Sequence, residues 1–98
     1  MKLLVEFDIN GDIIDVPQFI IDNKDRYASK FYQWLSDKRV HHSYWIKGPG
    51  GMKCLCYRSD AFVEWLNKKV LKESNEKAVI LEQFVAIDEY IHLPSIFF

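Results

Sequence analysis

The stretch LLVEFDINGDIIDVP, residues 3–17, decides the fold class of this chain. Its first part places apolar residues at every second position with acidic residues between them, which is typical of a half-buried β-strand. Asn10-Gly11 follows, and this dipeptide is the strongest two-residue signal for a hairpin, because both residues tolerate a positive φ. Residues 12–16 should therefore return as an antiparallel strand. The predicted pairs are Phe7 with Ile14 and Val5 with Val16.

A helical region is predicted directly after this hairpin. Pro17 can open a helix, because the first helical position needs no N–H donor. Apolar residues at helical spacing then run from Ile20 to Leu35. The polar residues 22–25 interrupt this pattern, so we expect a short helix followed by a longer one near 24–37.

A second hairpin and a second helical region follow. Residues 43–47 and 52–57 flank the loop Gly48-Pro49-Gly50-Gly51, which predicts two strands joined by a four-residue turn. Ser59 is a suitable N-cap for the next helix, and Asp60 suits its first turn. The predicted buried face of this helix consists of Phe62, Val63, Leu66 and Val70, with Trp65 beside them.

The last part of the chain is expected to add strands. Residues 77–86 could form a helix or a strand, and their β-branched content favours a strand. His92-Leu93-Pro94 predicts a turn, and residues 95–98 a short edge strand. The chain is therefore predicted to be one α+β domain, residues 1–98, with a small mixed or antiparallel sheet of four to six strands packed against two helices. The predicted core contains Phe7, Ile14, Phe31, Leu35, Phe62 and Leu66.

The order of elements is compatible with a ferredoxin-like split βαβ arrangement, which serves many unrelated functions. A winged-helix-like DNA-binding unit within residues 43–66 is the weaker alternative, because no helix-turn-helix with a short turn precedes it.

Charge is distributed unevenly along the chain. The net charge is −1, but residues 1–23 carry −4, residues 24–77 carry +6 and residues 78–98 carry −3. Such a chain can present a basic face to a polyanion or to an acidic protein, although the basic residues could also simply solvate two amphipathic helices. The acidic residues do not include a pair in an apolar setting, which would suggest raised pKa values, and they are therefore expected to be solvated.

The sequence predicts a cytoplasmic protein. No apolar run has the roughly 18 residues that a membrane span requires, and the apolar start of the chain is interrupted at once by Glu6. Cys54 and Cys56 are expected to be reduced and to bind no metal. A zinc site with His41 and His42 is the alternative, but neither pair has the usual ligand spacing.

No catalytic or cofactor motif is present. The loop Lys47-Gly48-Pro49-Gly50-Gly51 lacks the Gly-Lys-Ser/Thr ending of a phosphate-binding loop, and a strand rather than a helix follows it. Neither cysteine lies next to a predicted helix N-terminus. His41 and His42 precede the paired strand and could lie within several residues of the cysteines, but no feature of the sequence marks either pair as a catalytic site. We therefore expect no enzymatic activity and no cofactor.

The predicted partner-binding residues lie on or beside the second hairpin: Tyr44, Trp45, Lys47, Lys53 and Arg58. Tyrosine, tryptophan and arginine are enriched at interface hot spots. We expect a small binding or regulatory protein that acts on a larger protein partner. The alternative is a nucleic-acid-binding protein that uses the basic aromatic hairpin of residues 38–58. Self-association through an edge strand is a further option, and the residue usage suggests a bacterial or phage origin.

Overall fold

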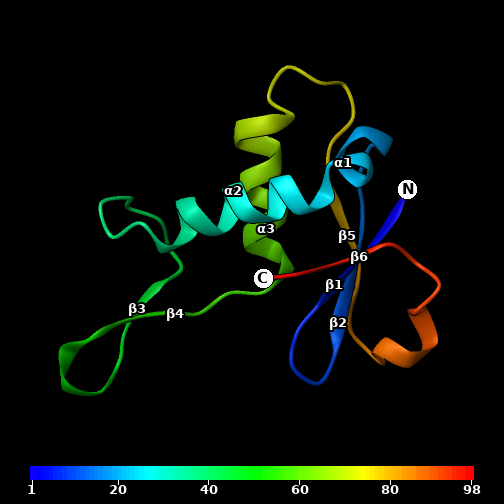
Figure 1. Cartoon of the computed structure of the whole chain (residues 1–98). Coiled ribbons are helices and arrows are strands. Elements are labelled where there is room, and N and C mark those ends of the chain that lie inside the picture. Colours follow the sequence, from blue (N-terminus) through cyan, green and yellow to red (C-terminus); the bar gives the residue numbers. More distant parts are fainter.

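Four strands form the main sheet, in the order β5-β2-β1-β6 (Figure 1). The computed structural model describes all residues, 1–98. Strand β1 (Lys2–Glu6) pairs antiparallel with β2 (Gly11–Asp15), which pairs antiparallel with β5 (Val79–Val85). Strand β6 (Ser95–Phe97) runs parallel to β1. The predicted α+β class and the mixed sheet of at least four strands are confirmed, as is the prediction that 77–86 contains a strand.

The helices pack on one face of this sheet. Helix α1 (Gln18–Asp22) and helix α2 (Lys24–Ser36) are separated at Asn23, as predicted. Helix α3 (Ser59–Trp65) continues into a π-helical turn, η2 (Leu66–Val70). Two short 3-10 turns, η1 (Pro49–Gly51) and η3 (Ile87–Tyr90), complete the structure. No helix has both the length and the apolar character that a membrane crossing requires.

The core lies between the sheet and the helices. Five of the six predicted core residues are completely buried there, and Phe7 packs against them from a half-buried position. Phe31 of α2 is central, because its ring lies 5.2 Å from that of Phe62 and 5.9 Å from that of Trp65. On the other face, Leu4 and Ile13 are also buried, and η3 lies against β1.

The first hairpin has a different register from the predicted one. Leu3 pairs with Ile14 and Glu6 with Gly11, so residues 7–10 form the turn and Gly11 already belongs to β2. Neither Asn10 nor Gly11 has a positive φ, and a two-residue turn of the predicted type requires one. A Cβ atom on Gly11 would lie 2.9 Å from the carbonyl oxygen of Val5. Glycine at this position therefore permits close packing within the sheet.

The π turn changes which residues of the second helical region are buried. The N–H of Leu71 donates to the carbonyl of Leu66 at 2.7 Å, across five residues. Leu66 and Leu71 are both completely buried, whereas Val70, which helical spacing predicts in the core, is only half-buried. Asn67 then joins this turn to the start of β5, accepting from the N–H of Ala78 at 2.7 Å and donating to its carbonyl at 3.0 Å.

The second hairpin lies outside the main sheet. Strands β3 (Trp45–Lys47) and β4 (Lys53–Leu55) form a two-stranded sheet of their own, which projects from the body at the end of α2 (Figure 1). The molecule is correspondingly elongated, with principal extents of 42 × 34 × 20 Å. Because this hairpin does not join the other strands, the split βαβ arrangement is not formed.

Candidate functional site

The central hairpin sorts its side chains onto two faces. Trp45 pairs with Leu55 and Lys47 pairs with Lys53, so these four residues share one face. Ile46 lies opposite Cys54 on the other face and is 47% exposed. The two lysines are thus direct cross-strand neighbours with the same charge.

A glycine-rich loop closes the hairpin. Gly50 and Gly51 have φ values of 71° and 78°, which other residues rarely adopt. The N–H of Gly48 donates to the carbonyl of Met52 at 2.6 Å, and a Cβ atom on Gly48 would lie only 2.6 Å from Sγ of Cys54. The loop is therefore tightly closed, and it exposes the side chain of Met52 at its tip.

His42 holds the base of the hairpin against the end of α2. Its Nδ1 accepts from the N–H of Tyr44 at 3.2 Å, so its Nε2 donates to the carbonyl of Leu35 at 2.8 Å. Its ring also lies parallel to that of Trp45, 5.5 Å away, and 4.8 Å from that of Trp34. His42 is therefore occupied by structural contacts and is not a free ligand.

Tyr44 connects the base of the hairpin to α3. Its hydroxyl donates to the carboxylate of Glu64, whose other oxygen accepts from Lys68 at 2.6 Å. Burial, the hydrogen bond to Glu64 and the charge of that carboxylate raise the pKa of Tyr44. The hydrogen bonds from Lys68 and Tyr44 lower the pKa of Glu64. The base of the hairpin is therefore fixed on both helices, whereas its tip projects freely.

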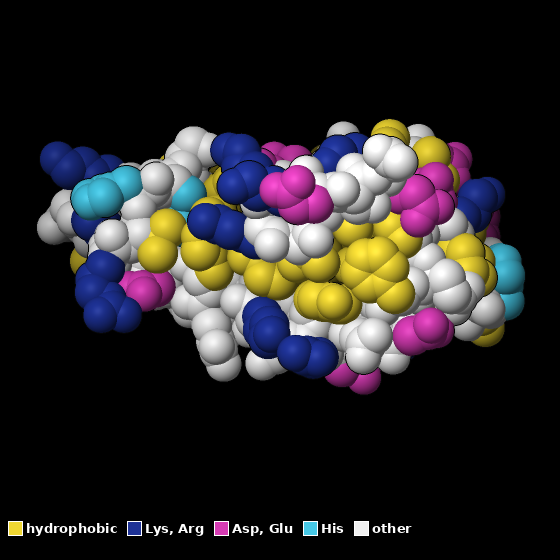
Figure 2. Space-filling model, turned by 90° about the horizontal axis from the view of Figure 1, so that it is seen from above, with side chains coloured by type: hydrophobic (Ala, Val, Ile, Leu, Met, Phe, Trp, Pro, Cys, Tyr) yellow, Lys and Arg dark blue, Asp and Glu magenta, His cyan; other side chains and the backbone are white.

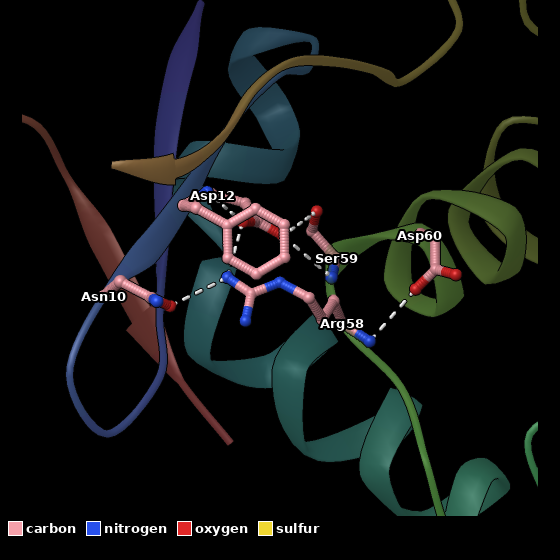
Figure 3. A network of polar contacts seen from close by, with 6 residues as sticks. Asn10, Asp12, Arg58, Ser59 and Asp60 are labelled. Atoms are coloured by element: carbon pink, nitrogen blue, oxygen red, sulfur yellow. Dashed lines mark hydrogen bonds and ion pairs between the residues drawn. The ribbon is translucent and has the colours of Figure 1, made fainter. Parts of the chain in front are cut away.

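Arg58 lies in a different environment, at the N-terminus of α3 (Figure 3). Its guanidinium donates to the carboxylate of Asp12 at 2.7 Å and to the side-chain oxygen of Asn10 at 2.9 Å. The same group lies between two rings, 4.4 Å from the centre of Phe7 and 4.0 Å from that of Phe84. Arg58 thus joins β2, β5 and α3 and lies apart from the lysines of the hairpin.

Asp12 is the acceptor at the centre of this network. It is completely buried and also accepts from the hydroxyl of Ser59 at 2.6 Å and from the N–H of Phe84 at 3.1 Å. Burial alone would raise the pKa of Asp12, but the hydrogen bonds from Arg58, Ser59 and Phe84 together lower it. The expectation that the acidic residues are all solvated is therefore wrong at this position.

Two local consequences follow from the position of Asp12. Ser59 is the first residue of α3 rather than its N-cap, because its hydroxyl is directed to Asp12. Instead, Asp60 accepts from the N–H groups of Arg58 and Ala61. Phe84 has a φ of 58°, unusual for a residue with a side chain, and the β2–β5 register shifts beside it. This conformation directs its N–H inward to Asp12.

A groove lies beside the base of the hairpin, between the end of α2, residues 40–43 and the α3–η2 segment. It has a volume of about 420 Å³, and its lining residues are Trp34, Val40, His41, His42, Ser43, Glu64, Trp65, Lys68 and Lys69. Figure 2, which views the molecule from above, shows a strip of apolar side chains bordered by Lys and Arg and also by Asp and Glu side chains. In the groove itself the basic side chains are Lys68 and Lys69 of η2.

The cysteines have free thiols. Cys54 is half-buried beneath Gly48 and Cys56 is exposed. No group of three histidine, cysteine or acidic side chains converges in a way that could hold a metal ion.

The structure thus brings together four of the five predicted partner-binding residues. Tyr44, Trp45, Lys47 and Lys53 lie on the hairpin, and Arg58 lies in the network with Asp12. Two features of the structure differ from what the sequence predicts: Asp12 is buried, and a groove lies beside the hairpin. A signal for the first was present, because Asp12 interrupts the apolar strand Gly11–Asp15 on the side that faces the helices. In the sequence, Lys68 and Lys69 are not distinguished from basic residues that solvate an amphipathic helix.

Comparison of the chain with protein-family models, with curated proteins and with solved structures finds no match.

Proposed function

We propose that the chain is a small non-enzymatic binding protein whose central hairpin docks on an acidic surface of a larger protein partner. One observation carries the proposal: Lys47 and Lys53 lie directly opposite each other on an exposed two-stranded hairpin, and neither forms an ion pair. Like charges in this position destabilise a hairpin. No acidic residue lies between positions 38 and 59 to offset the repulsion between the two lysines. A carboxylate of a partner protein would offset it.

The side chains near the tip support a protein partner. Met52, next to Lys53 at the tip, is 68% exposed, and Ile46 is 47% exposed on the face opposite the lysines, so the projecting part of the hairpin presents aliphatic groups beside its two cations. A protein surface with acidic and apolar groups complements this combination. The aromatic rings, by contrast, are occupied: Trp45 stacks on His42, and Tyr44 donates to Glu64. Nucleic-acid binders of the single-stranded class need free rings on which bases can stack.

The test is affinity capture from the native host with the full chain, followed by mass spectrometry, with and without nuclease. The expected result is a stoichiometric protein that resists nuclease and is lost in the variant Lys47→Glu with Lys53→Glu. The matched control is Lys2→Glu with Lys24→Glu, which changes the net charge equally at positions on β1 and at the start of α2. Circular dichroism of both variants confirms that they are folded.

Two results would contradict the proposal. If the folded hairpin variant captures the same protein in the same amount as the wild type, the hairpin is not the docking face. If nuclease treatment abolishes the capture, the alternative of nucleic-acid binding is favoured instead. In that case the affinity for nucleic acid should also fall steeply with salt, because each neutralised phosphate releases counterions.

A further inference from the structure

The groove between α2 and η2 has apolar walls and basic rims. Trp34 contributes its half-buried ring from α2, and Trp65 closes the other side from α3. The volume of about 420 Å³ is large enough for an aliphatic or aromatic side chain from another molecule. Lys68 and Lys69 line the groove beside these apolar residues. An occupant with an apolar side facing the two tryptophans and acidic groups at its edge would complement both features.

The charges within the groove support an acidic occupant. Glu64 is the only acid in the lining, and both of its oxygens are already engaged, by Lys68 and by Tyr44. Lys69 and His41 are exposed at the rim, and neither contacts a carboxylate. The groove therefore has an excess of positive charge that no residue of the chain neutralises.

The π turn of η2 is a second, independent observation. Its wider turn places Leu66 and Leu71 in the core, and the residues between them include Lys68 and Lys69, which face the groove. A helix that continued regularly would instead place residue 70 over residue 66. Single π turns within helices occur frequently at functional sites.

We infer that this groove binds an acidic amphipathic segment of the protein partner. An apolar side chain of the segment enters between Trp34 and Trp65, and its carboxylates contact Lys69 and the rim of the groove. The inference rests on the proposed function, and it names the chemistry of the partner segment. A phosphodiester backbone fits less well, because it requires a row of cations along its path rather than an apolar floor between two rims.

The probe is a synthetic fluorescein-labelled helical peptide with leucine along one face and glutamate on the others. One control peptide has the same composition in scrambled order, and a second has lysine in place of glutamate. Binding to the full chain is followed by fluorescence anisotropy and by the indole N–H signals of the ¹⁵N-labelled protein. We expect the acidic amphipathic peptide alone to bind, with the largest shifts at Trp34 and Trp65.

Charge reversal then locates the contact. Lys69→Glu should weaken binding about tenfold, the effect of losing roughly 1.4 kcal/mol of interaction. The control Lys2→Glu, at the exposed first residue of β1, should change it less than about twofold. The hairpin variant Lys47→Glu with Lys53→Glu should retain the affinity for the peptide, so failure of the groove and failure of the hairpin can be distinguished.

Several outcomes would overturn the inference. These are equal binding of the scrambled or the basic peptide, no binding of any peptide, and indole signals of Trp34 and Trp65 that do not move. Shifts of these two signals with protein concentration alone would assign the groove to a second copy of the chain. Tighter binding of oligothymidylate than of the peptide would assign it to nucleic acid.

Discussion

Two basic regions of this molecule differ in whether an acidic residue of the chain pairs with them. Arg58 is paired with Asp12, which lies 46 residues away along the chain, and is enclosed by two aromatic rings. Lys47 and Lys53 are exposed, lie opposite each other on the hairpin, and form no ion pair. The charge of Arg58 contributes to the stability of the fold, whereas the charges of the two lysines form no stabilising ion pair within the chain.

The residue type alone does not decide whether a basic side chain stabilises the fold or remains available to a partner. Arg58 and the two lysines lie within twelve consecutive positions and all carry a positive charge. What separates them is the sheet register, which places the carboxylate of Asp12 beneath the start of α3. A base that finds an acid within the chain stabilises the fold, and a base that does not is available to a partner.

The largest effect is expected for Asp12→Ala, which should lower the free energy of unfolding by about 3–5 kcal/mol. The substitution leaves the guanidinium of Arg58, the hydroxyl of Ser59 and the N–H of Phe84 without their shared acceptor. Urea denaturation followed by circular dichroism measures the change.

The control for this substitution is Asp8→Ala, at an exposed position of the neighbouring turn, which should alter stability by no more than about 0.5 kcal/mol. Asp12→Asn provides a milder variant if Asp12→Ala does not fold. Equal stability of the variants at positions 12 and 8 would show that the network does not stabilise the domain.

The next prediction compares a leucine in the core with a leucine at the base of the hairpin. Leu66→Ala should cost about 2–5 kcal/mol, because Leu66 is completely buried and its removal leaves a cavity. Leu55→Ala, on the half-buried base of the hairpin, should cost less than about 1 kcal/mol. The same urea titration measures both, and a larger loss for Leu55 than for Leu66 would mean that the hairpin is an integral part of the core.

The stability of the protein should also depend on pH through Asp12. Since its hydrogen bonds hold the pKa of Asp12 below its ordinary value of 3.8, the carboxylate stabilises the fold above that value. This stabilisation is lost as the pH falls through the lowered pKa of the folded state. Urea titrations of the wild type should therefore show declining stability below about pH 4. In Asp12→Asn the decline should be shallower, and parallel curves would exclude this role of Asp12.

The smallest effect concerns the paired lysines. Lys53→Glu replaces a like-charge pair by an opposite-charge pair, which should stabilise the hairpin by roughly 0.2–1 kcal/mol. Slower amide hydrogen exchange at Ile46 and Cys54 is the measurement, and the neutral variant Lys53→Gln should fall between the two. Faster exchange in Lys53→Glu would mean that the two lysines do not repel each other.

Most elements of the fold could be predicted from the sequence, but their register and grouping could not. The helix break at Asn23 and the final strands follow from local patterns. The turn of the first hairpin does not, because burial of Asp12 opposite Val5 and close packing at Gly11 outweigh the local preference of Asn10-Gly11 for a tight turn. The separation of the second hairpin from the main sheet depends on contacts between distant residues.

For the candidate site as well, contacts between distant segments could not be predicted from the sequence. The hairpin follows from the glycine loop, but its register does not: the predicted four-residue turn places Lys47 opposite Met52, whereas Lys47 pairs with Lys53. The engagement of Tyr44 with Glu64 and of Arg58 with Asp12 does not follow either, because each pair joins segments that no local pattern relates. The groove depends in addition on the π turn, and no residue of η2 signals the extra residue in that turn.

The inward-turned amide of Phe84 has a consequence for how the protein behaves at high concentration. β5 is an edge strand with exposed Val79 and Leu81, and a regular edge of this kind invites strands of other molecules to add to it. The two register shifts in its pairing with β2 and the positive φ of Phe84 make β5 irregular, and a bent or bulged strand is a poorer template for a further strand. The irregularity that directs the N–H of Phe84 to Asp12 should therefore also reduce edge-to-edge aggregation.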